Sequence, residues 1–253
     1  MPLSIFLWAL FVLPIWQLCI RIPVAFGGKA NVVYTLLAGY VLGTAVVMLL
    51  DRRYGPPVPK RRYSVPSPGW LFSALLAGMG FAILGSEIGN IGNDLAQMPI
   101  AIEDPRRGDA PPWLVVILSS LVHPICFMMV VVGIAGRSIL AIQRPWPAII
   151  VTAFIGSIGA PMHLMPQLAL VTGLPAWLFA RTRSILLTWF AYLPMGLLPL
   201  LELLGLSPGI EGFDAFEGDV RAFQPLWFNL LGAVLVVVGL FPILASLEEP
   251  SSE

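Results

Sequence analysis

Charged residues are scarce in this chain, and their scarcity excludes most soluble folds. Only 11% of the 253 residues are Asp, Glu, Lys or Arg, whereas 58% are hydrophobic, and the mean hydropathy is +0.88. A soluble domain carries about 25% charged residues, so this chain lacks the polar surface that water requires. The 14 basic and 14 acidic residues cancel, and no block of like charge suggests a nucleic-acid partner. The composition therefore predicts an integral membrane protein in contact with membrane lipid.

Cysteine and histidine are also rare, with two residues of each kind. Cys19 and Cys126 both lie inside apolar runs, which predicts small buried side chains and neither a disulfide nor a thiolate metal site. A metal site needs three or more convergent ligands, and two histidines do not supply them. The chain also lacks a Gly-x-Ser-x-Gly elbow, a His-Glu-x-x-His helix and a pair of intramembrane aspartates. The residues alone therefore predict no metal and no cofactor.

Long apolar runs are abundant, and they predict an all-α, polytopic transmembrane helix bundle of about eight spans. A spanning helix needs roughly 20 mostly apolar residues. The predicted segments are 3–20, 31–50, 69–87, 113–135, 146–164, 166–181, 184–205 and 225–246. Seven spans is the alternative, because the fifth and sixth segments are separated only by a short corner. We expect residues 1–253 to form a single membrane domain whose first segment is retained, since no cleavage site follows it.

The basic residues are distributed unevenly between the two sets of loops. Nine follow the second, fourth and sixth segments, and five follow the first, third and seventh. The nine are Arg52, Arg53, Lys60, Arg61, Arg62, Arg137, Arg144, Arg181 and Arg183, and the five are Arg21, Lys29, Arg106, Arg107 and Arg221. Because positive loops favour the cytoplasm, this bias predicts that both termini are cytoplasmic, in a bacterial inner membrane.

Glycine and proline are frequent, with 24 residues of each. Within membrane spans, small residues let helix backbones approach closely. The glycines expected to do so here are Gly78, Gly80, Gly156 and Gly159. Two longer loops, 89–112 and 206–225, mix Gly and Pro with acidic and apolar residues, and we expect them to fold back on the outer membrane surface.

Three ionisable residues are predicted at membrane depth: His123, His163 and Glu202. Such residues are costly in lipid and usually face a bundle interior or a wet cavity. His123 lies near mid-bilayer and precedes Pro124, whose missing N–H leaves a carbonyl of its own helix unpaired. Its imidazole is either a working group or a packed side chain that hydrogen-bonds a carbonyl of a neighbouring helix. His163 is flanked by prolines that interrupt the backbone, and Glu202, close to the interface, is the weakest candidate.

Three stretches of the second half follow one another in a recognisable order: "FIGSIGAPMHLMP", "GLPAWLFARTRSILLTWFAYLPMG" and "FQPLWFNLLGAVLVVVGLF". This order resembles the CPBP family of intramembrane proteases, which groups the CAAX prenyl endopeptidases of the Rce type with bacteriocin-processing relatives. The resemblance covers about residues 113–245. Its most specific part is the spacing of Gly173, Arg181, Thr182 and Ser184, which matches the family's "Gly…Arg-Thr-Gly-Ser" pattern.

The same resemblance places substitutions at nearly every catalytic position. The family has a Glu-Glu-x-x-x-Arg helix, then Phe-x-x-x-His, then His-x-x-x-Asn. The residues at those positions are, in order, His123, Pro124, Met128, Gly159, His163, Tyr192 and Gly196. The candidate site is therefore His123, His163 and Tyr192, and the resemblance implies that these three residues surround one cavity.

The groups that are replaced are the ones that carry the reaction in the family. There a glutamate acts as general base on a water, histidines assist it, and the asparagine binds the oxyanion. Their loss predicts a non-catalytic homologue that acts as a membrane accessory or substrate-binding protein in processing or sorting membrane-anchored proteins, for example in a myxosortase-like system. The partners that this implies are a hydrophobic peptide or transmembrane tail, and an active protease of the same family.

Two alternatives stay open from the sequence. The first is an active but atypical endopeptidase that uses His123 and His163, with Tyr192 as a hydrogen-bond donor and with help from a metal or from Glu202. The second is a transporter or lipid-handling membrane protein. Transporters commonly show internal repeats, and no matching halves are visible in this chain.

Overall fold

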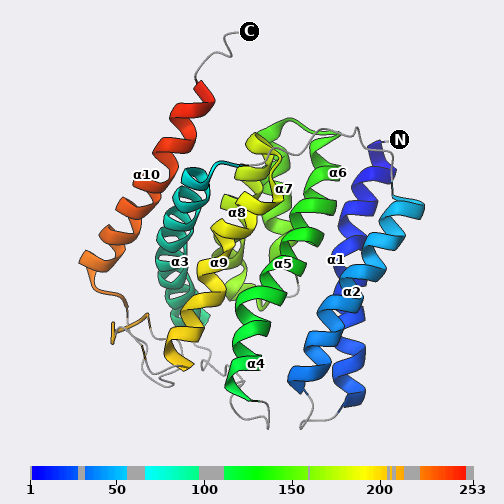
Figure 1. Ribbon diagram of the computed structural model, residues 1–253, viewed down its shortest axis with the longest axis horizontal. Coiled ribbons are helices and arrows are strands. Elements are labelled where there is room, and N and C mark those ends of the chain that lie inside the picture. The colour runs from blue at the N-terminus through cyan, green and yellow to red at the C-terminus, as the bar shows by residue number, and fades with distance from the viewer. Residues whose placement is uncertain are drawn as a thin grey trace.

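The computed structural model is an all-helical bundle (Figure 1), and the residues it describes contain no strand. These residues are 2–27, 32–55, 66–96, 111–158, 160–203, 206, 209–213 and 223–248. Five helices are long and apolar enough to cross a membrane: Leu3–Phe26, Val32–Tyr54, Pro68–Ala96, Trp113–Leu140 and Leu226–Ser246. This architecture confirms the predicted helical membrane bundle.

Each of the eight predicted segments falls on helical structure. The helices other than those of the fourth segment are α1 (Pro2–Gly27), α2 (Val32–Tyr54), α3 (Pro68–Ala96), α7 (Pro145–Ser157), α8 (Met165–Thr182), α9 (Ile185–Leu203) and α10 (Leu226–Glu248). Proline helps to set where they begin, since Pro145 opens α7 and Pro166 lies in the first turn of α8. The first turn tolerates proline because its N–H groups have no partner within the helix.

The fourth segment is one continuous helical run that π-helical turns interrupt twice. Its parts are α4 (Pro112–Ile117), η3 (Leu118–Val122), α5 (His123–Met128), η4 (Met129–Gly136) and α6 (Arg137–Leu140). This run forms the centre of the bundle, because 56% of its most apolar stretch is buried, against 22% for α10. Met128, Val130 and Val131 are completely buried within it.

Three predicted boundaries are wrong by seven residues or more. The first segment was expected to end at residue 20, but α1 continues to Gly27. The third segment was expected to end at residue 87, but α3 continues to Ala96, because Gly89 and Gly92 let α8 and the turn before it pack against this polar extension. The fifth segment was expected to reach residue 164, but α7 ends at Ser157, and Ile158 is extended. Pro161, which cannot continue the helical hydrogen-bond ladder, follows shortly after. Residues 97–110, within the first of the two long loops, lie outside the described part of the chain.

Glycine brings the helices into close contact, as predicted. A Cβ added at Gly78 would collide with the carbonyl of Ala191 in α9, and one at Gly80 would collide with the carbonyl of Gly232 in α10. A Cβ at Gly156 would lie 2.6 Å from Cγ2 of Thr172 in α8. The prediction is confirmed for these three glycines, whereas Gly159 lies outside the described residues.

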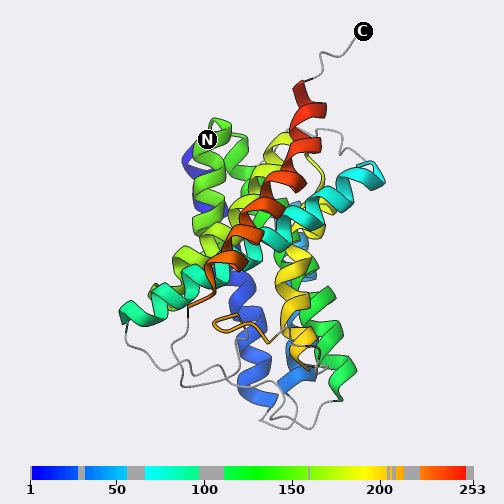
Figure 2. The same cartoon turned by 90° about the vertical axis from the view of Figure 1, so that its left-hand side faces the viewer.

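Helix α10 lies at the edge of the bundle, where it packs against α3 (Figures 1 and 2). The two helices are antiparallel, since Gly80 faces Val236 and Gly239 faces Ala77. The start of α1 and the end of α10 lie at the same end of the molecule (Figure 1). This placement is what an even number of crossings produces.

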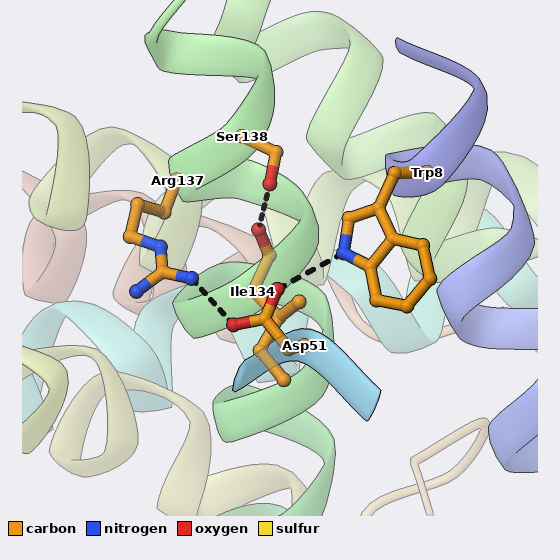
Figure 3. A network of polar contacts seen from close by, with 5 residues as sticks. All are labelled: Trp8, Asp51, Ile134, Arg137 and Ser138. Carbon is orange, nitrogen blue, oxygen red and sulfur yellow. Dashed lines mark hydrogen bonds and ion pairs between the residues drawn. The ribbon is translucent and has the colours of Figure 1, made fainter. Parts of the chain in front are cut away.

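A polar network joins three helices at that end of the bundle (Figure 3). Arg137 Nη2 donates to Asp51 Oδ2 at 2.6 Å, and Trp8 Nε1 donates to the other carboxylate oxygen at 2.9 Å. Ser138 Oγ donates to the carbonyl of Ile134 at 2.8 Å. The network ties the hairpin of α1 and α2 to the end of the central helical run.

Candidate functional site

His123 lies among aromatic rings that come from three helices. The centre of its ring is 5.1 Å from that of Tyr40 in α2, 5.6 Å from that of Phe127 in α5 and 6.4 Å from that of Tyr192 in α9. Phe127 and Tyr192 stack with centres 5.3 Å apart. The structure therefore brings together two of the three predicted site residues, His123 and Tyr192.

Helix α1 completes this group through Trp16, which is almost fully buried. Its ring centre lies 5.5 Å from that of Tyr40 and 6.1 Å from that of Phe127. Trp16 Nε1 donates to Thr44 Oγ1 at 2.9 Å, and the Cys126 thiol lies beside the same hydroxyl. Both cysteines are free; Cys126 is buried, as predicted, whereas Cys19 is only partly buried. We call Trp16, Tyr40, His123, Phe127 and Tyr192 the aromatic cluster.

Pro124 explains the local backbone at the cluster. The N–H of His123 donates to the carbonyl of Leu118, five residues earlier, in the π pattern of η3. The next N–H in this register would reach the carbonyl of Ser119, but proline has none. Gly196 of α9 packs directly against the Ser119 carbonyl oxygen, since a Cβ at residue 196 would collide with that oxygen. Aligning α9 with α5 in this way brings Tyr192, one turn before Gly196, next to His123.

A second contact holds the same two helices together. Ser120 Oγ donates to the carbonyl of Gly196 at 3.2 Å, and both residues are buried. Ser119 Oγ turns back to the carbonyl of Val115 at 2.8 Å, within its own helix. π-Helical turns inside longer helices are frequent at functional sites, and this one lies immediately before His123.

Apart from Trp16 Nε1, the polar atoms of the aromatic cluster have no hydrogen-bond partners among the described residues. Within the described residues, the hydroxyls of Tyr40 and Tyr192 and the imidazole of His123 make no hydrogen bond. Tyr192 is only 5% exposed, so its hydroxyl lies inside the bundle without a partner in the described part of the chain. His123 is therefore packed among aromatic rings, but the carbonyl hydrogen bond that the packed alternative expected is not formed within the described residues.

The chemistry available at the cluster is hydrogen bonding. An imidazole and two phenols can donate and accept hydrogen bonds, but no carboxylate of the described chain pairs with His123. The described residues also contain no group of three or more His, Cys, Asp or Glu side chains that could hold a metal ion. Such a set suits recognition of a polar group within an apolar ligand better than activation of water.

His163 lies elsewhere in the bundle. It belongs to the short 3₁₀ turn Met162–Leu164 (η5), and a Cβ at Gly92 of α3 would collide with its carbonyl oxygen. Helix α3 meets Ala191, the neighbour of Tyr192, at Gly78. Gly78 and Gly92 are 14 residues apart in one helix, a rise of about 21 Å. The structure therefore does not bring His163 to the level of His123 and Tyr192.

The remaining predicted positions contribute little to the cluster. Met128, where the family has arginine, is fully buried in the core. Glu202 belongs to α9, but its side chain lies outside the described part of the structure, as does Gly159. Sequence reasoning missed Tyr40 and Trp16. One signal was available, since tryptophan is typical of membrane interfaces and Trp16 stands inside an apolar segment.

The corner between α8 and α9 carries the residues that most resemble the family. Thr182 Oγ1 accepts from the backbone N–H of Ser184 at 3.3 Å, and Ser184 Oγ accepts from that of Leu187 at 3.3 Å, so both side chains cap the corner. Arg183 between them has a φ of 57°. That left-handed conformation favours glycine, which is the residue the family has at this position.

No family model, curated protein or solved structure matches this chain. The CPBP resemblance therefore rests on the order of the sequence motifs.

Proposed function

We propose that this chain is a non-catalytic membrane protein that binds an apolar transmembrane segment and presents it to a processing or sorting enzyme. In this proposal it is a degenerate relative of the CPBP intramembrane proteases, serving as an accessory or substrate-binding protein. Its ligand is a hydrophobic peptide or a transmembrane tail, as on the anchored substrates of a myxosortase-like system. Its catalytic partner is an active protease of the same family.

The observation that carries the proposal is the set of unpaired polar groups that the described residues show at the aromatic cluster. Tyr40, His123 and Tyr192 come from three helices, and their polar atoms make no hydrogen bond within the described residues. A peptide in lipid must satisfy each exposed backbone N–H and C=O, so unpaired donors and acceptors at mid-membrane are suited to hold a locally unwound segment. The aromatic faces of Phe127 and Trp16 suit its apolar side chains.

Two features support the absence of catalysis. His123 has aromatic neighbours and no carboxylate partner within the described chain. The turn that holds His163 packs on α3 about 21 Å from the level of Ala191, the neighbour of Tyr192. An endopeptidase that uses both histidines would need them at one water molecule. The capped corner at Thr182 and Ser184, with Arg183 in a glycine-favouring conformation, supports descent from the family scaffold.

We also propose that the protein lies in a bacterial inner membrane with both termini in the cytoplasm. Helix α8 runs antiparallel to α3, since Gly85 faces Val171 and Gly89 faces Gln167. The end of α8 is therefore at the same end of the bundle as the Asp51–Arg137 pair. The described arginines gathered there are Arg52, Arg53, Arg137, Arg144, Arg181 and Arg183. This end is the cytoplasmic one by the positive-inside rule.

Binding and cleavage can be measured together with one reporter. The purified protein in lipid nanodiscs is mixed with a fluorescent single-span peptide that ends in a short basic tail. We expect the peptide to bind and to stay intact. His123→Ala and Tyr192→Phe should each weaken binding about 3- to 10-fold, because each removes one hydrogen bond. Phe154→Ala, a change at an exposed side chain of α7, is the control and should leave the affinity unchanged.

Two outcomes would contradict the proposal. Cleavage of the peptide that disappears in His123→Ala would establish the endopeptidase alternative. Binding that is equally strong in His123→Ala, Tyr192→Phe and Phe154→Ala would show that the aromatic cluster does not recognise the peptide.

A further inference from the structure

A second polar cluster lies where α3 meets α10. Its centre is the carboxylate of Glu87, the last residue of the predicted segment 69–87. Helix α3 has 29 residues, a length of about 43 Å, so it extends beyond a hydrocarbon core of about 30 Å at both ends. Glu87 lies about 13 Å before the end of α3. Glu87 therefore stands where the apolar stretch of α3, residues 69–87, passes into its polar extension, and an ionisable group at such a depth indicates a functional site.

The carboxylate of Glu87 has two hydrogen-bond donors and no basic partner in the described chain. Glu87 Oε2 accepts from the backbone N–H of Gln224 at 2.9 Å and from Asn90 Nδ2 at 3.2 Å. Within the described residues, its other oxygen accepts no hydrogen bond, and no Lys or Arg forms an ion pair with it. Within the described residues, no basic side chain compensates this negative charge.

Two buried side-chain amides next to this carboxylate lack partners. Gln224 is 5% exposed, and neither Nε2 nor Oε1 of its side chain has a hydrogen-bond partner. Asn229 Oδ1 is also buried without a partner. Buried polar groups in folded proteins are nearly always hydrogen-bonded, so three unpaired amide atoms at one helix junction point to a missing group.

The geometry of α10 places these amides beside Glu87. Gln224 directly precedes the proline before α10, and Asn229 is the fourth residue of this helix. Helices α3 and α10 are antiparallel, with Ile83 facing Gly232. One turn further along each helix, Asn229 is opposite Glu87. The hydrogen bond from the backbone N–H of Gln224 to Glu87 Oε2 holds Gln224 next to the same carboxylate.

Two described residues of the segment before α10, Gly212 and Phe213, contact this junction. Asn90 Nδ2 donates to the carbonyl of Gly212 at 2.6 Å, and the rings of Phe213 and Phe228 pack edge to face with centres 4.8 Å apart. These contacts attach residues 212 and 213 to α3 and α10 close to Glu87.

We propose that Glu87, Gln224 and Asn229 form a binding site for a monovalent alkali cation. Carboxylate and amide oxygens are the hard ligands that such cations take. One carboxylate matches a single positive charge, and the described residues contain no cluster of three acidic, His or Cys side chains that would suit a divalent metal. The cation compensates Glu87 and satisfies the oxygens Oε1 of Gln224 and Oδ1 of Asn229.

Thermal unfolding of the purified full-length protein in detergent tests this site with the ions alone. Samples in NaCl, KCl and choline chloride are compared at equal ionic strength. We expect the melting temperature to rise saturably with Na⁺ or K⁺ but not with choline, by about 5 to 10 °C when the cation is 100-fold above its dissociation constant. The difference between the two alkali ions identifies the preferred one.

Variants separate this site from general salt effects. Glu87→Gln and Asn229→Ala should each reduce or abolish the response to the alkali cation, whereas Glu211→Gln, a change at an exposed acid, should keep it. Equal melting temperatures of the unmodified protein in all three salts would overturn the proposal even if Glu87→Gln failed to fold.

Discussion

At the scale of single residues, Gly196 controls the contact between α9 and the central helical run. Gly196→Ala places a methyl group against the Ser119 carbonyl and 3.2 Å from Cγ of Pro124. The Ser119 carbonyl and the Pro124 ring are both held in the central helical run, so neither can move freely. Overpacking of this kind costs about 1 to 3 kcal/mol of folding stability. We expect Gly196→Ala to lower the melting temperature of the purified protein.

Gly173 in α8 supplies the matched control for that substitution. A Cβ there would meet only Cβ of Ala153, at 3.9 Å, which is an ordinary contact. Since alanine favours a helix over glycine by up to about 1 kcal/mol, Gly173→Ala should leave the melting temperature unchanged or raise it. Equal effects of the two substitutions would show that α9 and the central run can separate easily at Gly196.

The residues of the site were only partly predictable. The motif resemblance paired His123 with Tyr192, and the structure places their rings 6.4 Å apart. It also implied that His163 joins them, which depends on how far α8 slides along α3. Gly85, Gly89 and Gly92 set that register, and sequence inspection does not reveal which partner each glycine meets. Tyr40 was missed for the same reason, since it reaches the cluster from a separate helix.

At the scale of elements, the hairpin of α1 and α2 is fastened to α6 by the pair Asp51–Arg137. The Asp51 side chain is 13% exposed and that of Arg137 is 30% exposed, so solvent screens the pair only in part. Arg137→Gln should destabilise the protein by about 1 to 3 kcal/mol, because it removes a charge-assisted bond and leaves the carboxylate with Trp8 alone. Arg144→Gln, at an exposed position, should change stability by less than about 0.5 kcal/mol.

A double-mutant cycle isolates the pair from other effects of each change. If Asp51 and Arg137 stabilise each other, then Asp51→Asn combined with Arg137→Gln should cost less than the sum of the two single changes. Additive costs would show that the bond in Figure 3 contributes nothing to docking the hairpin.

Element positions followed from hydropathy, whereas their internal geometry did not. All eight predicted segments contain helix, because length and apolar content are local properties of a chain. The π-helical turn η3, directly before His123, arises from Pro124 together with the approach of Gly196 from α9. Because Gly196 is distant in the sequence, the local sequence does not predict this turn. The continuation of α3 to Ala96 likewise depends on its contacts with α8 and η5, and the polar sequence of this part of α3 does not predict them.

At the scale of the whole molecule, five helices are long enough to span a membrane, but the path of the chain passes through the bundle more often. Helix α8 is antiparallel to α3, and a single capped corner, Thr182 to Ser184, reverses the chain into α9. Helix α10 is again antiparallel to α3. Helices α7, α8 and α9 therefore each run from one end of the bundle toward the other, although they are shorter or less apolar than the five.

Cysteine labelling in intact cells tests this eight-pass path and the orientation together. In a background with Cys19→Ala and Cys126→Ala, a membrane-impermeant maleimide should modify Glu211→Cys, which precedes α10, without lysis. Arg52→Cys and Arg144→Cys should react only after the membrane is opened, because the proposed orientation places their end of the bundle in the cytoplasm. Labelling of Arg52→Cys and Glu211→Cys from the same side would contradict the eight-pass path, whereas a uniform reversal would keep the path and overturn the orientation.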